Sequence, residues 1–361
     1  MMSIGRRFRI TLFGSSHGPE VGVSLEGVPA GTVVALDRIQ AALDRRRPVG
    51  RRLATKRQEE DRLIVDAGLV GGTADGRPIR MHVANEDVQR APYDRLRDTP
   101  RPGHADYPAR IRYGPEADLS GGGIFSGRMT VGLVIAGAIA GQMLSRRGIE
   151  VASFTRSIAG VGAAIDDAMP LAEIRRLRDL NEVGCPDLGA AQQMEESIAR
   201  ARRDGDSVGG IVETRIVGCP VGLGEPFFDS VESAIAHLAF SVPAVKGIEF
   251  GAGFRAADMR GSVHNDAFEW NGQHVVTRTN NSGGILGGLA TGMPVVFRVV
   301  VKPTSSIARP QSTVNLATHQ VEELVVTGRH DPCIVPRAVV VLESIAASAV
   351  VDLALAGGYL S

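Results

Sequence analysis

A histidine follows a Pro-Gly pair in the stretch Arg101-Pro102-Gly103-His104-Ala105-Asp106-Tyr107. Proline restricts one backbone angle and glycine reaches conformations that other residues avoid, so the stretch predicts a stiff loop that fixes the imidazole. Histidine titrates near neutral pH, and the nearby Gly121-Gly122-Gly123 exposes backbone N–H groups that an anion can approach. The stretch is a candidate proton-transfer site beside an anion site. The alternative is a surface turn that happens to contain a histidine.

A second histidine lies in the loop Gly14-Ser15-Ser16-His17-Gly18-Pro19, between two glycines and beside a hydroxyl group. The strand-like segments 8–13 and 21–25 flank this loop. His17 is therefore a second candidate for proton transfer.

An arginine-rich run extends over residues 45–57, and acidic residues follow it at 59–61. Arginine grips phosphate and carboxylate groups with two parallel hydrogen bonds, which favours an anion-binding role for the run. A solvated basic loop or a nucleic-acid patch is the alternative. The basic members are Arg45, Arg46, Arg47, Arg51, Arg52, Lys56 and Arg57.

Two loops rich in glycine or hydroxyl groups flank a predicted strand at 295–301. They are Asn280-Asn281-Ser282-Gly283-Gly284-Ile285-Leu286-Gly287-Gly288 and Lys302-Pro303-Thr304-Ser305-Ser306. Backbone donors, hydroxyls and one ammonium group are what phosphate binding requires, although no Walker lysine motif is present. A third polar segment, Gly328-Arg329-His330-Asp331-Pro332-Cys333, precedes Arg337. By contrast, Gly251-Ala252-Gly253 is interpreted as a turn, because Gly261 and Asn265 interrupt the helix that a dinucleotide fingerprint needs.

Hydrophobic periodicity predicts the elements that position these loops. Helices are expected from Leu36 to about Arg47, over the apolar stretch 131–144, from the cap pattern Asp229-Ser230-Val231-Glu232 to about Phe240, and after Arg337 to about Leu355, with peripheral helices at 171–180 and 190–203. Strands are expected at 8–13, 21–25, 63–69, 79–83, 149–154, 208–217 and 295–301. No linker or internal repeat divides the chain, so residues 1–361 are expected to form a single domain.

The composition excludes several classes of protein. The 361 residues contain 40 Lys and Arg against 40 Asp and Glu, so no global basic field exists to hold nucleic acid. Three cysteines without metal-ligand spacing argue against a disulfide framework and against structural zinc. No signal peptide is recognisable, and the apolar stretch 131–144 is too short to span a bilayer. These features predict a cytoplasmic protein with no membrane partner.

Several long blocks together resemble the chorismate synthase family, in order and spacing, along nearly the whole chain. They are the two histidine loops, Arg45-Arg46-Arg47-Pro48, the glycine triplet, Gly205-Asp206-Ser207-Val208-Gly209, Gly222-Leu223-Gly224-Glu225-Pro226, the loops at 280–288 and 302–306, and residues 328–333. The resemblance implies an α+β fold in which antiparallel sheets sandwich a helical layer, and a homotetramer. It also implies a lyase that uses reduced FMN to convert 5-enolpyruvylshikimate 3-phosphate to chorismate and phosphate by anti-1,4-elimination, with no net redox change.

The resemblance assigns roles to individual residues. His17 and His104 match the acids that protonate the departing phosphate and maintain the ionisation of the reduced flavin. Ser16 and Asp331 match a pair proposed to take a proton from the flavin, and without the family match Asp331 could simply cap a turn. A substrate with one phosphate and two carboxylates requires cationic partners, for which Arg46, Arg52, Arg128 and Arg337 are the candidates. The flavin contacts implied are Phe125, Ser126, Ala244, Gly287, Lys302, Pro303, Thr304, Ser305, Ser306 and Arg329. His330 is interpreted as structural, and the remaining histidines receive no role.

Three positions depart from the usual family pattern. Ser15 replaces a glutamate, and Ser120 and Ile124 replace arginines that commonly bracket the triplet, whereas Phe125-Ser126-Gly127-Arg128 matches one branch. The departures keep two alternatives open: a paralogue that acts on a related enolpyruvyl or phosphate ester, and a non-catalytic flavin- or anion-binding protein. The sequence leaves open whether NADPH reduces the flavin on this protein or an external reductase does so.

Overall fold

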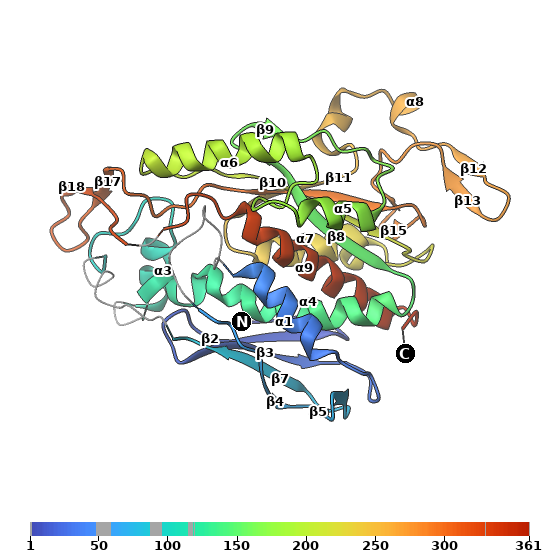
Figure 1. Ribbon diagram of the computed structural model, residues 1–361, viewed down its shortest axis with the longest axis horizontal. Coiled ribbons are helices and arrows are strands. Elements are labelled where there is room, and N and C mark those ends of the chain that lie inside the picture. The colour runs from blue at the N-terminus through green and yellow to red at the C-terminus, as the bar shows by residue number, and fades with distance from the viewer. Residues whose placement is uncertain are drawn as a thin grey trace.

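Two antiparallel sheets enclose a layer of helices (Figure 1). The computed structural model describes residues 2–47, 59–86, 96–114, 118, 120–328 and 330–360, so Arg52 and Arg329 lie outside the described residues. The observed architecture confirms the expected α+β sandwich.

The first sheet has the strand order β1-β2-β3-β7-β4. Alternate residues of its central strands are buried against the helices, as the period of two in a half-buried strand requires. The loop between β2 and β3 carries His17, so this sheet fixes the first candidate histidine. The strands are β1 (Ser3–Ile4), β2 (Arg9–Gly14), β3 (Glu20–Glu26), β7 (Ile79–Ala84) and β4 (Ile64–Ala67).

The second sheet has the strand order β11-β16-β10-β8-β9. Its strand β16 leads directly into the predicted phosphate-binding loop that begins at Lys302. The strands are β11 (Val245–Phe250), β16 (Val295–Val301), β10 (Gly210–Val217), β8 (Glu150–Ile158) and β9 (Val161–Gly162).

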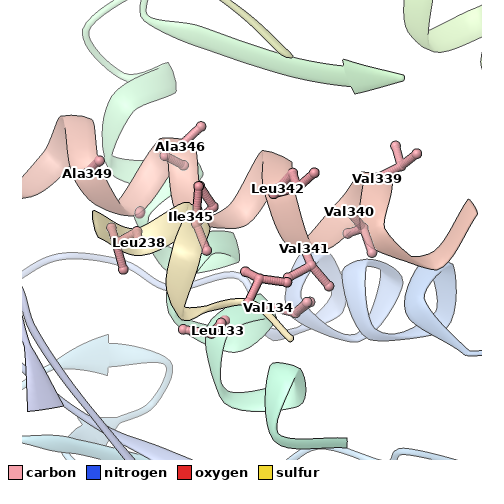
Figure 2. Close-up of a cluster of buried hydrophobic side chains, with 14 of the residues drawn as sticks. Leu133, Val134, Leu238, Val339, Val340, Val341, Leu342, Ile345, Ala346 and Ala349 are labelled. Atoms are coloured by element: carbon pink, nitrogen blue, oxygen red, sulfur yellow. The ribbon is translucent and has the colours of Figure 1, made fainter. Parts of the chain in front are cut away.

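Four helices, α1 (Leu36–Arg46), α4 (Thr130–Ser145), α7 (Val231–Ser241) and α9 (Val335–Ala356), form the layer between the sheets. Helix α4 packs on the first sheet, α9 packs on the second, and the two helices pack against each other. An added Cβ at Gly137 of α4 would lie 2.2 Å from the Cβ of Ser344 on α9, so the helices cross at small residues. Figure 2 shows side chains of this core, among them Leu133 and Val134 of α4, Leu238 of α7 and Ile345 of α9.

Shorter elements surround the sandwich. Helices α5 (Leu171–Arg178) and α6 (Leu188–Arg203) pack on β8, and α3 (Asp106–Tyr113) follows the His104 loop. The hairpin of β12 and β13 projects from one end of the molecule beside α8, and the hairpin of β17 and β18 projects from the other (Figure 1). The small elements are β5 (Leu69–Val70), β6 (Thr73–Ala74), α8 (Gly261–His264), β12 (Phe268–Trp270), β13 (Val275–Thr277), β14 (Ile285–Leu286), β15 (Leu289–Ala290), β17 (Gln311–Val314), β18 (Val321–Leu324) and the 3₁₀ turns η1 (Ser120–Phe125), η2 (Gly127–Met129), η3 (Phe227–Asp229) and η4 (Gly253–Asp258).

Most of the predicted elements are confirmed, and their differences from the structure have local causes. The predicted strand 63–69 is interrupted because Gly68 adopts a φ of +84°. The cap of α7 lies within the predicted segment 229–232, where the hydroxyl of Ser230 accepts a hydrogen bond from the N–H of Ser233 at 3.0 Å. Residues 253–258 form a 3₁₀ turn, which agrees with the rejection of a dinucleotide fingerprint.

Two helical stretches, Gly127–Ser145 and Val335–Ala356, are long and apolar enough to cross a membrane by length and composition. In both, 83% of the most apolar window is buried inside the protein, as is usual for core helices. The first is longer than the 14-residue apolar run 131–144 expected from the sequence, because η2 continues into α4.

A largely buried ion cluster joins α9 to α1 and α5. Glu343 accepts hydrogen bonds from Arg45 at 2.7 Å and from Arg178 at 2.5 Å. Burial alone would raise the pKa of Glu343, but the two guanidinium groups lower it to about 2. The carboxylate is therefore ionised throughout the neutral range.

Glu343→Gln is expected to destabilise the protein by about 3 kcal/mol, because it leaves two cations without their shared anion. The lower end of the range for buried pairs applies because the Glu343 side chain is 18% exposed. Since folding lowers this pKa from 4.5, the contribution is complete above about pH 5 and is lost as the pH falls towards 2. Urea unfolding at pH 7 and pH 3 measures both effects. Glu173→Gln, in an exposed pair with Arg176, is the control and should change stability far less. Equal stability of Glu343→Gln and the native protein at pH 7 would contradict the assignment.

Candidate active site

A cavity of about 780 Å³ opens where the histidine loops, the end of α1, the start of α9 and the Lys302 loop converge. One part of its wall is apolar and includes Phe125, Val242, Ile334 and Val341, and the rest is polar. The volume lies in the range of small-molecule binding sites. The cavity brings together segments that are far apart in the sequence.

The glycine triplet is the surface against which both candidate histidines pack. Gly121, Gly122 and Gly123 have φ values of +59°, +88° and +53°, in the left-handed region that favours glycine. An added Cβ at Gly121 would lie 1.9 Å from Cε1 of His17, and one at Gly122 would lie 3.4 Å from Cε1 of His104. The two imidazoles therefore rest on consecutive glycines, which places two proton-transfer groups on one wall of the cavity.

Gly121→Ala should displace the His17 ring, because the new methyl group would occupy the ring's position and the backbone conformation would be strained. A displacement of about 1 Å at a reacting group can lower the rate by roughly 10²-fold, and we expect a loss of that size in kcat. Steady-state kinetics measures it. Gly141→Ala is the control, since nothing lies within 4 Å of a Cβ added there. Wild-type kcat in Gly121→Ala would show that the close approach has no catalytic consequence.

Ser16 contacts His17 and is itself fully buried. The Ser16 hydroxyl lies 3.2 Å from Nδ1 of His17, and the Ser16 N–H donates to the carbonyl of Gly123 at 3.3 Å. His17 lines the cavity, whereas Ser16 is not among the described residues that do so. The contact with Nδ1 couples the Ser16 hydroxyl to the His17 ring on the cavity wall.

His104 is held by an ion pair that belongs to the same sequence motif. Its Nδ1 lies 2.6 Å from Oδ1 of Asp106 and 3.1 Å from Nη2 of Arg101. Arg101 also donates to Asp106 from Nε at 2.7 Å and from Nη2 at 2.8 Å. Both Arg101 and Asp106 are buried, so the imidazole has a rigid support on the side away from the triplet.

A chain of charged side chains forms another wall. Asp61 accepts from Arg128 at Oδ1 and from Arg46 at Oδ2, the latter at 2.6 Å. The carbonyl of Arg46 accepts from Nε of Arg337 at 3.1 Å, and Nη1 of Arg337 donates to Asp331 at 2.7 Å. Three of the four predicted substrate-binding arginines are thus held in one connected array.

Burial and repulsion from neighbouring cations lower the pKa of Arg46. Burial lowers the pKa of Arg46 to about 10, partly offset by Asp61 and reinforced by Arg337 and Arg128. The Arg46 Nε atom is buried and has no hydrogen-bond partner among the described residues. Burial would raise the pKa of Asp61, but Arg46 and Arg128 hold it below its ordinary value. Arg46 and Asp61 are therefore both charged at neutral pH, and Arg46 retains an unused donor among the described residues.

The Lys302 loop closes the cavity near His104. Lys302 Nζ donates to the carbonyl of Gly103 at 2.5 Å and to the Ser305 hydroxyl at 2.9 Å. Burial and the nearby charge of Lys246 lower the pKa of Lys302. Thr304 donates to the backbone carbonyl of Asp331 at 2.8 Å. The loop therefore presents an ammonium group and hydroxyls beside the His104 loop and Asp331.

Most of the site residues expected from the sequence lie together in this cavity. Ser16 and Gly287 are the two described members of the expected set that do not line it, and Gly287 lies instead in the turn between β14 and β15. The lining members of the expected set are His17, His104, Asp331, Arg46, Arg128, Arg337, Phe125, Ser126, Ala244, Lys302, Pro303, Thr304, Ser305 and Ser306.

Sequence reasoning missed several residues that line the cavity or support its lining residues from behind. Arg101 and Asp106 belong to the His104 motif, and their charges beside a candidate acid were the available signal. His330, expected to be structural, lines the cavity, and burial and Arg101 lower its pKa. Its buried Nε2 has no hydrogen-bond partner among the described residues. Asp61 had no motif to mark it, since its importance depends on the arginines that meet it.

The departures from the family pattern have different structural consequences. Ile124 lies on the cavity wall, so an apolar side chain occupies a place where an arginine is common. Ser120 is not among the described lining residues, and its N–H donates to Asp118 at 3.0 Å. The carbonyl of Ser15 accepts from the Asn85 amide at 3.0 Å. Only the Ile124 departure removes charge from the described wall itself.

The cavity nevertheless remains strongly cationic. Among the described lining residues, six carry lysine or arginine charges and two carry carboxylates. The cationic members are Arg46, Arg101, Arg128, Lys246, Lys302 and Arg337, and the acidic members are Glu59 and Asp331. Fold and site define an enzyme that binds an anionic small molecule and transfers protons beside it.

The comparisons with known proteins agree with this class. A sequence profile of the chorismate synthase family matches residues 8–355. The chorismate synthase of Korarchaeum cryptofilum is 47% identical over 351 residues, covering 96% of each chain, and that of Dehalococcoides mccartyi (strain ATCC BAA-2266) is 45% identical over 356 residues, covering 99% of this chain and 97% of the relative. A crystal structure of chorismate synthase superposes with a TM-score of 0.79 at 27% identity, covering 98% of this chain and 93% of the other. The chain belongs to the chorismate synthase family and is a carbon–oxygen lyase of the shikimate pathway. This finding favours the lyase interpretation over both alternatives.

Proposed function

We propose that the cavity binds reduced FMN together with 5-enolpyruvylshikimate 3-phosphate and eliminates phosphate to give chorismate. The observation that carries the proposal is the placement of His17 and His104 on one glycine triplet, in the same cavity as the array of Arg128, Arg46 and Arg337. Proton donors and an anion clamp are the two requirements of a phosphate elimination.

The residues of the cavity fit a flavin. The apolar wall around Phe125 and Val242 suits a planar ring, and the Lys302 loop offers an ammonium group and hydroxyls to a phosphate. When bound, reduced FMN supplies electron density that assists departure of the phosphate and is recovered at the end of the cycle. The chain's own residues must then position the substrate and control the protons.

The substrate's phosphate and two carboxylates match the cationic wall. Arg46, with its unused buried Nε donor, and Arg128 and Arg337 each present guanidinium groups that are already oriented by carboxylates or carbonyls. Such preorganisation lowers the entropy lost when an anion is bound. Arg52 is proposed as a fourth partner on the resemblance alone.

Protons are handled at three positions. His17 and His104 donate protons to the leaving phosphate and maintain the flavin's ionisation, and Asp331 accepts a proton at its carboxylate. Arg337 holds one Asp331 oxygen at 2.7 Å and so fixes the direction of the other. Ser16 is proposed to act with Asp331 in taking this proton, and its hydroxyl also contacts the His17 ring.

Arg46→Ala should weaken substrate binding while FMN affinity changes less. Loss of a charged hydrogen bond is worth about 1.5–3 kcal/mol, which corresponds to roughly a 10- to 150-fold rise in the substrate's Kd. Arg47→Ala is the matched control, because Arg47 belongs to the same run but is not among the described lining residues. Calorimetric titration measures both affinities. Salt-sensitive DNA or RNA binding that is lost in Arg46→Ala would instead support a nucleic-acid patch.

Several further properties are proposed from the family relationship. The chain acts as a single domain in a homotetramer in the cytoplasm, and its flavin is reduced either by NADPH on this protein or by an external reductase. Light scattering measures the assembly, and flavin bleaching by NADPH under anaerobic conditions distinguishes the two reductants.

Binding of both ligands by the same cavity provides the first test of the proposal. Oxidised FMN permits binding without turnover, and we expect saturable binding of both FMN and the phosphorylated substrate by calorimetry. Substrate affinity should fall in Arg337→Ala. Binding of FMN without any binding of the substrate would contradict the proposed reaction and support action on another ester.

A further inference from the structure

Nδ1 of His104 lies between an anion and a cation. It is 2.6 Å from Oδ1 of Asp106 and 3.1 Å from Nη2 of Arg101. A ring nitrogen carries either a hydrogen or a lone pair, so Nδ1 can donate to Asp106 or accept from Arg101 but cannot do both. The choice between these hydrogen bonds determines which tautomer the neutral imidazole adopts.

The distances favour donation to Asp106, and the competing contact is the hydrogen bond from Nη2 of Arg101. Either hydrogen bond would involve one charged partner, so both are charge-assisted, but the contact to Asp106 is 2.6 Å and that to Arg101 is 3.1 Å. Asp106 is held by the side chain and the backbone N–H of Arg101, the latter at 3.1 Å. Burial would raise the pKa of Asp106, but hydrogen bonds from Arg101 and His104 hold it well below its usual range. The carboxylate therefore remains an acceptor at every working pH.

The opposite nitrogen faces the glycine triplet. Nε2 of His104 lies 3.5 Å from the position of a Cβ added at Gly122, and both residues line the cavity. With hydrogen fixed on Nδ1, the imidazolium can release a proton only from Nε2, and the electrons of that N–H bond remain on Nε2. The neutral ring then presents a lone pair at Nε2 and can recover a proton at the same atom.

We propose that Asp106, clamped by Arg101, is the positioning residue that selects the Nδ1–H form of His104, so that Nε2 alone exchanges protons with a ligand. Arg101 also donates to the Ser306 hydroxyl at 3.1 Å and so ties this support to the Lys302 loop. The catalytic use of His104 rests on the proposed function, whereas its tautomer can be measured without flavin or substrate. An incorrect tautomer assignment can therefore be distinguished from an incorrect proposed function.

The test is a long-range ¹H–¹⁵N spectrum of the ligand-free full chain labelled with ¹⁵N-histidine. The His104 signals are identified by their loss in His104→Gln, and the pH is raised until the ring is neutral. We expect Nδ1 to resonate as a protonated nitrogen and Nε2 as an unprotonated one. The Nε2–H tautomer in the native protein would overturn the proposal without any further variant.

Two variants test the roles of Asp106 and Arg101 separately. Asp106→Ala should reverse the tautomer, because Arg101 is then free to donate to Nδ1, and should lower kcat by about 10²-fold or more with little change in KM for the substrate. Arg101→Gln retains Asp106 and should keep the Nδ1–H form. His82, whose Nδ1 lies 2.9 Å from Asp66, is an internal control whose signals should not change. An unchanged His104 tautomer in folded Asp106→Ala would contradict selection by Asp106.

Discussion

Asp331→Asn is expected to leave ligand binding nearly intact and to slow the elimination step by about 10²–10⁴-fold, the usual contribution of a positioned general base. Asparagine has nearly the same size, and its amide oxygen can still accept from Arg337. The hydrogen bond from Thr304 reaches the backbone carbonyl of residue 331 and is independent of the side chain. The substitution therefore removes the base while it preserves the wall. Anaerobic single-turnover kinetics with substrate bound measures the step directly.

Ser16→Ala provides the comparison for this prediction. If Ser16 and Asp331 act in one proton path, both variants should show slow elimination with near-normal affinity for substrate and FMN. Native turnover in Asp331→Asn would make Asp331 a turn-forming residue before Pro332, and the proton transfer would then belong to His17 or His104.

His17→Gln and His104→Gln are each expected to lower kcat by about 10²–10⁴-fold. Glutamine keeps a hydrogen-bonding group of similar length but cannot exchange a proton near neutral pH. Both rings rest on the glycine triplet, so the wall itself should persist in each variant. Steady-state kinetics of phosphate release under reduced flavin measures the loss.

His82→Gln is the matched control, because His82 lies on β7 in contact with Asp66 and is not among the described residues that line the cavity. It should retain native kcat. Native kcat in either cavity variant would remove that histidine from the mechanism, while similar losses in all three variants would indicate damage to the fold.

The sheets were largely predictable because their pattern is local. Alternation of apolar and polar residues in segments such as 79–83 reflects burial of one face, and the structure places this segment in β7 with that alternation. The interrupted strand at Gly68 was less predictable, since a glycine in an alternating run is equally compatible with a continuous strand.

Site residues could be predicted from the sequence where they lie within a recognisable motif. Both histidine loops and the Lys302 loop contain a proline with glycine or hydroxyl residues beside it, which marks stiff anion-binding turns, and all three loops contribute residues to the cavity. What spacing cannot show is which segments meet. Asp61 becomes important only because Arg46 and Arg128, which are distant in sequence, converge on it.

The role of glycine at position 121 depended on the same kind of long-range contact. The sequence suggested that the triplet offers backbone N–H groups to an anion. The structure adds that its missing side chain leaves room for the His17 ring. A close approach between two distant segments leaves no periodic signal in either one.

The central claim is that this cavity carries out elimination of phosphate with reduced flavin. The most direct measurement is anaerobic incubation of the protein with chemically reduced FMN and 5-enolpyruvylshikimate 3-phosphate, with phosphate and chorismate quantified together and oxidised FMN as the control. Equal amounts of the two products are expected under reduced flavin and none under oxidised flavin. Absence of chorismate while both ligands are demonstrably bound would show that this cavity does not carry out the elimination.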